Sequence, residues 1–194
     1  KVKEVELTKN NNAEIEEREV YETRSDGVIW RHYRNRWIGE CPTVAAKIYR
    51  FYCVAEAMAT LSPDPSTKVG CLVFGPGYEI RAQGWNGAPR GSNADRDERY
   101  NNRAERLMWA THSEQNAIAN AARVGTPLEG CAMLVTHYPC MSCAKTIVQA
   151  GIKQVVCPEP EAGFAERWAE DIQRTRALFY ECGVHLITFE EAAG

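Results

Sequence analysis

Apolar residues recur first at helical spacing and then at strand spacing in the middle of the chain. Over 43–61 they return every three or four positions, which predicts an amphipathic helix. The sequence Ser62-Pro63-Asp64-Pro65 ends that helix. Two short apolar runs follow, 69–74 and 80–85, with the turn Gly75-Pro76-Gly77 between them. Together they predict a β-hairpin.

Helical and strand patterns alternate through the rest of the chain. The predicted helices cover 114–123, 140–150 and 164–181, the last ended by Gly183, and the predicted strands cover 131–136, 154–157 and 184–189. The predicted order is therefore α, β, β, α, β, α, β, α, β. Such alternation is typical of an α/β layered domain.

Two segments lack this periodicity. Residues 1–42 are rich in charge and are interpreted as an N-terminal arm, flexible or laid on the surface, that precedes a catalytic domain over 43–194. Its aromatic and basic stretch 30–37 is suited to packing on the body or a neighbouring subunit, or to binding phosphate. The polar connection 86–111 is longer than most loops in compact domains, which favours either a functional loop or a solvated, partly helical insertion.

Composition narrows the class of protein. The chain has 194 residues, 44% of them hydrophobic and 25% charged, as in globular domains. A net charge of −3 argues against coating of a nucleic-acid polymer but leaves room for a local basic pocket. There is no apolar run of about 18 residues for a membrane span and no signal-peptide pattern. Eight cysteines in 194 residues are too sparse for a disulfide scaffold, so we expect a reduced, cytoplasmic protein.

Two short motifs carry the candidate chemistry. Pro139-Cys140-Met141-Ser142-Cys143 supplies two thiols, and His112-Ser113-Glu114 supplies an imidazole and a carboxylate. Thiolate sulfur and imidazole nitrogen suit Zn²⁺. A lone Cys-x-x-Cys also fits a redox pair or half of a structural zinc site, but the chain has no second such pair. The simplest site has three ligands, His112, Cys140 and Cys143, and three ligands leave the fourth zinc position open for water, as in catalytic sites.

Glu114 distinguishes a catalytic site from a structural one. Residues two apart on a helix point roughly 200° from each other, so His112 and Glu114 converge only at a helix end. There a carboxylate that is not a ligand can accept a proton from the water. The thiolates of Cys140 and Cys143 are favoured at a predicted helix N-terminus.

These motifs resemble those of the zinc-dependent cytidine deaminase superfamily, with its His-x-Glu and Pro-Cys-x-x-Cys blocks. More narrowly, the chain is similar to the deoxycytidylate (dCMP) deaminase branch over about 43–189. The matching blocks are Asp64-Pro65-Ser66-Thr67-Lys68-Val69-Gly70, Gly84-Trp85-Asn86-Gly87-Ala88-Pro89-Arg90-Gly91, His112-Ser113-Glu114-Gln115-Asn116-Ala117-Ile118, Pro139-Cys140-Met141-Ser142-Cys143-Ala144-Lys145 and Gln149-Ala150-Gly151-Ile152. Ser113 departs from the small apolar residue usual there, and we expect altered packing without loss of chemistry.

The resemblance implies a three-layer α-β-α fold with a mixed five-stranded sheet. It also implies hydrolytic deamination of dCMP to dUMP, the precursor of dTMP, with catalytic Zn²⁺ and Glu114 as the acid and base. Asn86 is expected to contact the deoxyribose or base, or to be a turn residue. The peptide around Thr111 and Ser113 is expected to contact the pyrimidine edge, and Tyr138 to cover the base or join the core. The candidate phosphate ligands are Lys68, Arg90, Arg167 and Arg24.

Regulation and assembly are further implications of the resemblance. Members are often hexamers that dCTP activates and dTTP inhibits, with Mg²⁺ plausible beside the triphosphate. The expected effector site combines the glycine-rich block with a cation at the end of the catalytic helix; its candidates are Gly84, Trp85, Asn86, Gly87, Arg90 and Arg123. For Arg123 the alternative is a favourable charge at a helix C-terminus.

Other functions stay open at this point. A sibling deaminase would act on cytidine, guanine, dCTP or a tRNA base, although the acidic balance disfavours tRNA. A zinc-stabilised binding module would have a closed metal site and no use for Glu114. A deaminase domain of the riboflavin pathway is usually fused to a reductase, and no dinucleotide-binding glycine motif is present.

Overall fold

The computed structural model describes residues 2–4, 6–9, 15–18, 21–23, 29–33, 36–40, 42–93, 99 and 101–189, with side chains from residue 47 onward. The short N-terminal strands are β1 (Val2–Glu4), β2 (Glu6–Lys9), β3 (Ile15–Arg18), β4 (Tyr21–Thr23), β5 (Ile29–Tyr33) and β6 (Arg36–Glu40). The elements that follow are α1 (Pro42–Ala59), β7 (Gly70–Phe74), β8 (Ile80–Trp85), α3 (Arg103–Trp109), α4 (Ser113–Val124), β9 (Ala132–Val135), α5 (Met141–Gln149), β10 (Gln154–Pro158), α6 (Ala162–Arg167), α7 (Ala169–Cys182) and β11 (His185–Phe189).

A six-stranded mixed sheet organises the molecule, in the order β1-β11-β10-β9-β7-β8. Strands β9, β10 and β11 are parallel, while β7 pairs antiparallel with both β8 and β9. These five strands confirm the predicted mixed sheet and the predicted hairpin. Strand β1 adds a sixth strand by pairing antiparallel with β11. The hydrophobic pattern does not reveal β1–β6, because charged residues interrupt each of these short strands.

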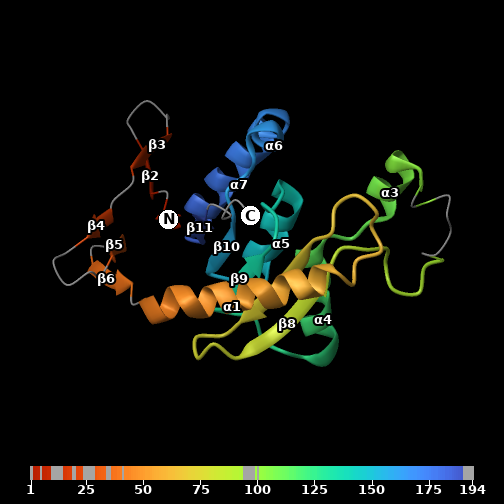
Figure 1. Ribbon diagram of the computed structural model, residues 1–194, viewed down its shortest axis with the longest axis horizontal. Helices are drawn as coiled ribbons and strands as arrows, with labels where there is room; N and C mark the ends of the chain where they lie inside the picture. Colours follow the sequence, from red (N-terminus) through yellow and green to blue (C-terminus); the bar gives the residue numbers. More distant parts are fainter. Residues whose placement is uncertain are drawn as a thin grey trace.

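Helices cover both faces of this sheet, which confirms the predicted three layers (Figure 1). One face packs on α1 through a core that includes Tyr52, Ala55, Leu72 and Leu134. The opposite face carries α4, α5 and α7, and its larger core contains Ile147 and Phe179 among others. Along each central strand, alternate side chains pack into one core and then the other, as expected for strands buried on both faces.

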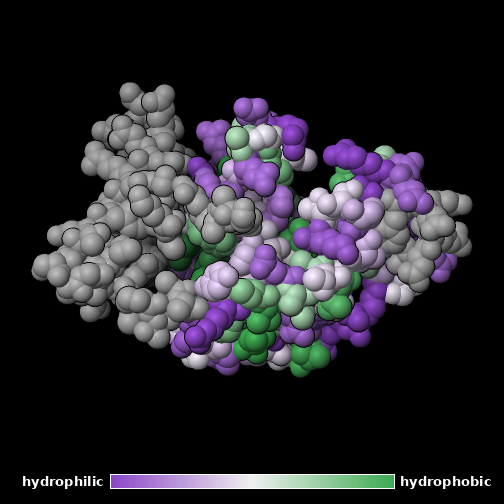
Figure 2. Space-filling model, viewed as in Figure 1, coloured by the Kyte–Doolittle hydropathy of each residue, from purple (hydrophilic) through white to green (hydrophobic). Residues whose placement is uncertain are grey.

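Two predicted segments differ in detail from the structure. The single helix expected over 164–181 is two helices, α6 and α7, because the backbone leaves helical geometry at Trp168 (φ −116°, ψ 18°). The long connection 86–111 contains α3, which agrees with the partly helical alternative. Figure 1 shows α3 projecting from the layered body at the end of this connection, and Figure 2 shows hydrophilic residues dominating the surface around it.

Two further expectations concern the described residues alone. Seven cysteines there, at 53, 71, 131, 140, 143, 157 and 182, are all free, as expected of a chain without a disulfide framework. No helix in the described ranges is both long and apolar enough to cross a membrane.

Candidate metal centre and active site

The predicted ligands His112, Cys140 and Cys143 lie together at the ends of two helices. Nδ1 of His112 is 3.5 Å from Sγ of Cys140 and 3.3 Å from Sγ of Cys143. All three candidate ligand atoms lie within 4.8 Å of one another, and within the described part of the chain no other group of His, Cys, Asp or Glu side chains meets this condition. Mutual spacing of this order and a donor set of one nitrogen and two sulfurs fit a tetrahedral Zn²⁺ with one open position.

Local structure explains why these side chains converge. His112 is the N-cap of α4, with extended backbone (φ −72°, ψ 156°), so it lies outside the helix that carries Glu114. Cys140 is the N-cap of α5, and Cys143 lies in the first turn of the same helix. The start of α5 is tied to α7, because the Met141 amide donates to Oδ2 of Asp171 at 3.0 Å. The three ligands therefore all come from the N-terminal ends of helices α4 and α5.

The cluster is strongly coupled electrostatically. A hydrogen bond from the Cys143 thiol lowers the pKa of Cys140 to about 4, and the same contact raises the pKa of Cys143. The hydrogen bond with Cys140 also raises the pKa of His112. A thiolate is therefore present at neutral pH even before a metal binds, and a metal cation would displace the remaining proton.

Glu114 lies next to this cluster and is only 4% exposed. Its Oε2 accepts a hydrogen bond of 2.9 Å from the hydroxyl of Ser113, which is itself completely buried. Burial raises the pKa of the Glu114 carboxyl group. A buried carboxylate with a raised pKa is suited to accepting and returning a proton near neutral pH.

The peptide before the metal centre is held by the glycine-rich block. The Gly87 amide donates to the Thr111 carbonyl at 3.1 Å, and the Thr111 amide donates to the Gly87 carbonyl at 2.8 Å. Asn86 is buried, with Oδ1 accepting from the Val69 amide at 2.8 Å and Nδ2 donating to the Thr67 carbonyl at 2.8 Å. Asn86 therefore fixes the loop before β7, whatever contact it makes with a substrate.

Tyr138 belongs to the larger core cluster and is 5% exposed. Its hydroxyl accepts a hydrogen bond from Nε of Arg176 at 3.2 Å, and burial raises its pKa. This placement agrees with the interpretation of Tyr138 as a core residue.

Three of the predicted effector residues contact α4. Gly84 packs against α4, the Trp85 carbonyl accepts from Nδ2 of Asn116 at 2.8 Å, and Nη2 of Arg90 donates to Oδ1 of Asn120 at 2.8 Å. The side chains of Lys68, Arg90, Arg123 and Arg167 are exposed. Arg123 lies in the last turn of α4. This position also agrees with the alternative interpretation, a favourable charge at a helix C-terminus. Arg24 lies outside the described residues.

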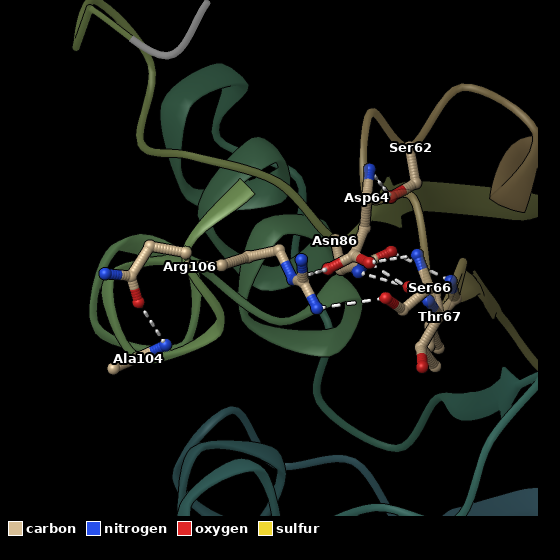
Figure 3. A network of polar contacts seen from close by, with 9 residues as sticks. Ser62, Asp64, Ser66, Thr67, Asn86, Ala104 and Arg106 are labelled. Carbon is tan, nitrogen blue, oxygen red and sulfur yellow. Dashed lines mark hydrogen bonds and ion pairs between the residues drawn. The ribbon is translucent and has the colours of Figure 1, made fainter. Parts of the chain in front are cut away.

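Sequence reasoning missed a polar network that joins α3 to the loop before β7 (Figure 3). Nε of Arg106 is 3.2 Å from Oδ2 of Asp64, and Nη2 of Arg106 donates to Oγ of Ser66 at 3.0 Å. The same arginine lines a surface pocket with Asn86, Trp109 and others. The turn residues Asp64 and Ser66 are visible in the sequence, but nothing there singles out Arg106 among the arginines of 86–111.

Comparison with known proteins places this geometry in a family. The model of the cytidine and deoxycytidylate deaminase zinc-binding region matches residues 46–159. The chain is 42% identical to an uncharacterized deaminase from the luxG 3′ region of Aliivibrio fischeri, over 71% of this chain and 89% of that one. It is 37% identical to human deoxycytidylate deaminase, over 55% of this chain and 61% of the human protein.

A solved structure agrees with these relatives. The crystal structure of dCMP deaminase from cyanophage S-TIM5, in complex with dCMP and dUMP, matches with a TM-score of 0.59 and 27% identity. The match covers 77% of this chain and 99% of the phage chain. The chain described here belongs to the cytidine and deoxycytidylate deaminase zinc-binding family.

Proposed function

We propose that this chain catalyses the hydrolytic deamination of dCMP, with water consumed and dUMP and ammonia released. One observation carries the proposal: a cluster of His112, Cys140 and Cys143 lies beside the buried carboxyl group of Glu114, in a chain of this deaminase family. The human relative and the cyanophage enzyme, which carry the name of this activity, support dCMP as the substrate.

The chain's own residues divide the chemistry between them. His112, Cys140 and Cys143 would hold the zinc ion, which when bound makes a water molecule acidic enough to supply a nucleophile at neutral pH. Glu114 accepts the proton of that nucleophile as it attacks C4 of cytosine. Glu114 then delivers this proton to N3, takes the remaining proton of the hydroxyl group now on C4 and passes it to the departing amine, so that the C4 carbonyl forms, the C4–N bond breaks and ammonia leaves. The Ser113 hydroxyl donates to Oε2 of Glu114 and so holds the carboxyl group that makes this transfer.

The substrate contacts are part of the same proposal. The backbone at Thr111 and Ser113 binds the polar edge of the pyrimidine, and Asn86 holds the neighbouring loop and contacts the deoxyribose. Lys68 is proposed as an outer cation near the sugar, and Tyr138 as support from the core beneath the base. The backbone pairing between Gly87 and Thr111 supports this arrangement, since it ties the glycine-rich block to the peptide that leads into His112.

We also propose regulation by dCTP as activator and dTTP as inhibitor in a homohexamer located in the cytoplasm. The effector would bind at Gly84–Arg90 and Arg123, with Mg²⁺ beside its phosphates. Contacts from this block to α4 support the proposal, because Arg90 bonds to Asn120 on the helix that begins at the metal centre. A titration with dTTP at constant zinc content is expected to lower activity, and a flat titration would refute this part.

The substrate proposal is tested by ammonia release over a panel of dCMP, deoxycytidine, cytidine, dCTP, guanine and tRNA. The wild-type chain is expected to prefer dCMP. Glu114→Gln is expected to lose turnover while keeping zinc, and Glu181→Gln, at an exposed glutamate on α7, serves as the matched control with unchanged activity. A preference for dCTP, another cytosine compound or a tRNA base would assign the chain to a sibling deaminase. Normal turnover by Glu114→Gln would refute the mechanism.

A further inference from the structure

We propose that a surface pocket beside the metal centre binds the 5′-phosphate of the nucleotide substrate. The residues that carry this inference are Asp64, Asn86, Arg99, Arg106, Trp109 and Ala110, which line one surface pocket and are called the arginine pocket below. The inference rests on the proposed function, because it concerns the part of the same nucleotide that the metal centre does not contact. None of the described cationic phosphate ligands expected from the sequence, Lys68, Arg90 and Arg167, is among the residues that line this pocket.

Arg106, which lines the arginine pocket, is held by the polar network drawn in Figure 3. Its ion pair with Asp64 is largely shielded, since the two side chains are only 13% and 12% exposed. Asp64 is itself fixed, because its Oδ1 accepts from the amides of Ser66 and Thr67 at 2.7 and 3.0 Å. A guanidinium that is already oriented loses little side-chain entropy on binding an anion.

Arg99, which also lines the arginine pocket, lies against the ring of Trp109. Its Cζ lies 3.5 Å from the centroid of the Trp109 ring. The indole is oriented in turn by a hydrogen bond of 3.2 Å from Nε1 to Oε2 of Glu105. Because Arg99 covers this face of the ring, a base does not stack there, whereas the N–H edges of a stacked guanidinium still reach an anion.

The charges of the arginine pocket fit a phosphate. Two guanidinium groups face one carboxylate, and that carboxylate already has Arg106 and two backbone amides as partners. The described side chains that line the pocket therefore carry a net positive charge, in a chain whose net charge is −3. Guanidinium groups bind phosphate oxygens through charge-assisted, often bidentate hydrogen bonds.

Position favours the substrate over an effector as the source of that phosphate. Ala110 lines the pocket and precedes the candidate ligand His112 by two residues, so their Cα atoms are at most about 7 Å apart. Asn86, which is proposed to contact the deoxyribose, lines the same pocket. A nucleotide with its base at the metal centre and its sugar at Asn86 would place its 5′-phosphate between Arg99 and Arg106.

The test compares dCMP with deoxycytidine, which lacks the phosphate, in Arg106→Gln and Arg99→Gln. We expect KM for dCMP to rise about tenfold to a hundredfold in each variant, as for loss of a charge-assisted hydrogen bond, with little change in kinetics on deoxycytidine. Arg106→Lys should recover part of the affinity. Arg103→Gln is the matched control, since Arg103 is an exposed arginine of the same helix outside the pocket, and it should leave KM unchanged.

The choice of variants distinguishes a loss of phosphate binding from a structural defect. Arg99→Gln leaves the ion pair of Arg106 with Asp64 intact, so a defect shared by both glutamine variants is not a consequence of losing that pair. The proposal is overturned if KM for dCMP stays at the wild-type value in both, or if dCMP and deoxycytidine are affected equally. An altered response to dTTP or dCTP with unchanged KM for dCMP would assign the pocket to an effector phosphate and also overturn it.

A direct binding measurement keeps this inference distinct from the proposed function. If the wild-type chain releases ammonia from neither dCMP nor deoxycytidine, the proposed function fails, and calorimetric titration with the two compounds then tests the pocket alone. Tighter binding of dCMP than of deoxycytidine in the wild type, lost in Arg106→Gln, supports the phosphate site. Equal binding of the two compounds by the wild type contradicts it.

Discussion

Gly84 lies where strand β8 passes closest to α4, the helix that begins at His112. A Cβ atom built at Gly84 would overlap the Ser113 carbonyl oxygen and lie 2.5 Å from the Ala117 amide nitrogen. Both neighbours are backbone atoms, so no side chain can rotate away to make room. The substitution Gly84→Ala must therefore push α4 away from the sheet, and His112 and Glu114 move with it.

The cost follows from overpacking of a buried contact. Extra methyl groups in a packed core usually destabilise by about 1–3 kcal/mol. For a chain of this length that corresponds to a melting temperature lowered by about 2–12 °C. Because a misplacement of about 1 Å in an active site can lower the rate a hundredfold, we expect kcat for dCMP to fall by about ten- to a hundredfold.

Thermal unfolding and steady-state kinetics on dCMP measure the two effects. The matched control is Gly163→Ala in α6, where the new Cβ would lie 3.7 Å from Nη1 of Arg167. That variant should keep its activity and hold or slightly raise its melting temperature, since alanine is favoured over glycine by about 1 kcal/mol inside a helix. A Gly84→Ala protein with wild-type melting temperature and kcat would refute the close approach of β8 to α4.

Three further predictions concern the site. Ser113→Ala removes the hydrogen bond to Glu114 and should lower kcat about three- to tenfold with KM little changed, and wild-type kcat would contradict the positioning role. Cys143→Ala should reduce bound zinc, measured by elemental analysis, from one ion per chain to a small fraction, and full occupancy would rule out this ligand. Asn86→Ala leaves the buried partners of its amide unpaired and should lower the free energy of unfolding, measured in urea, by about 1–3 kcal/mol, whereas an unchanged value would show that the loop is held otherwise.

The catalytic part of the fold is largely predictable because its signals are local. The predicted strand 80–85 coincides with β8, and the helix predicted to end before Gly183 does so, with Gly183 in the left-handed region at φ 66°. The break at Trp168 is not predictable in the same way. No proline or glycine marks it, so the local sequence does not show where α6 ends and α7 begins.

The residues of the candidate site also differ in how far they can be predicted from the sequence. His112, Glu114, Cys140 and Cys143 stand in two short motifs, and spacing within each motif indicates a shared metal centre. Arg106 shows no such spacing, since its partner Ser66 lies 40 positions earlier in the chain. Contacts between distant segments of this kind depend on how α3 folds back, which a local pattern does not encode.

The central claim is that the centre formed by His112, Cys140, Cys143 and Glu114 deaminates dCMP with the help of zinc. The most direct measurement incubates dCMP with zinc-loaded, chelator-stripped and zinc-reloaded protein, and quantifies dUMP and ammonia together. Our account predicts equal amounts of the two products, loss of both on stripping and recovery of both on reloading. Unchanged dCMP in the presence of protein that carries one zinc ion per chain would contradict it.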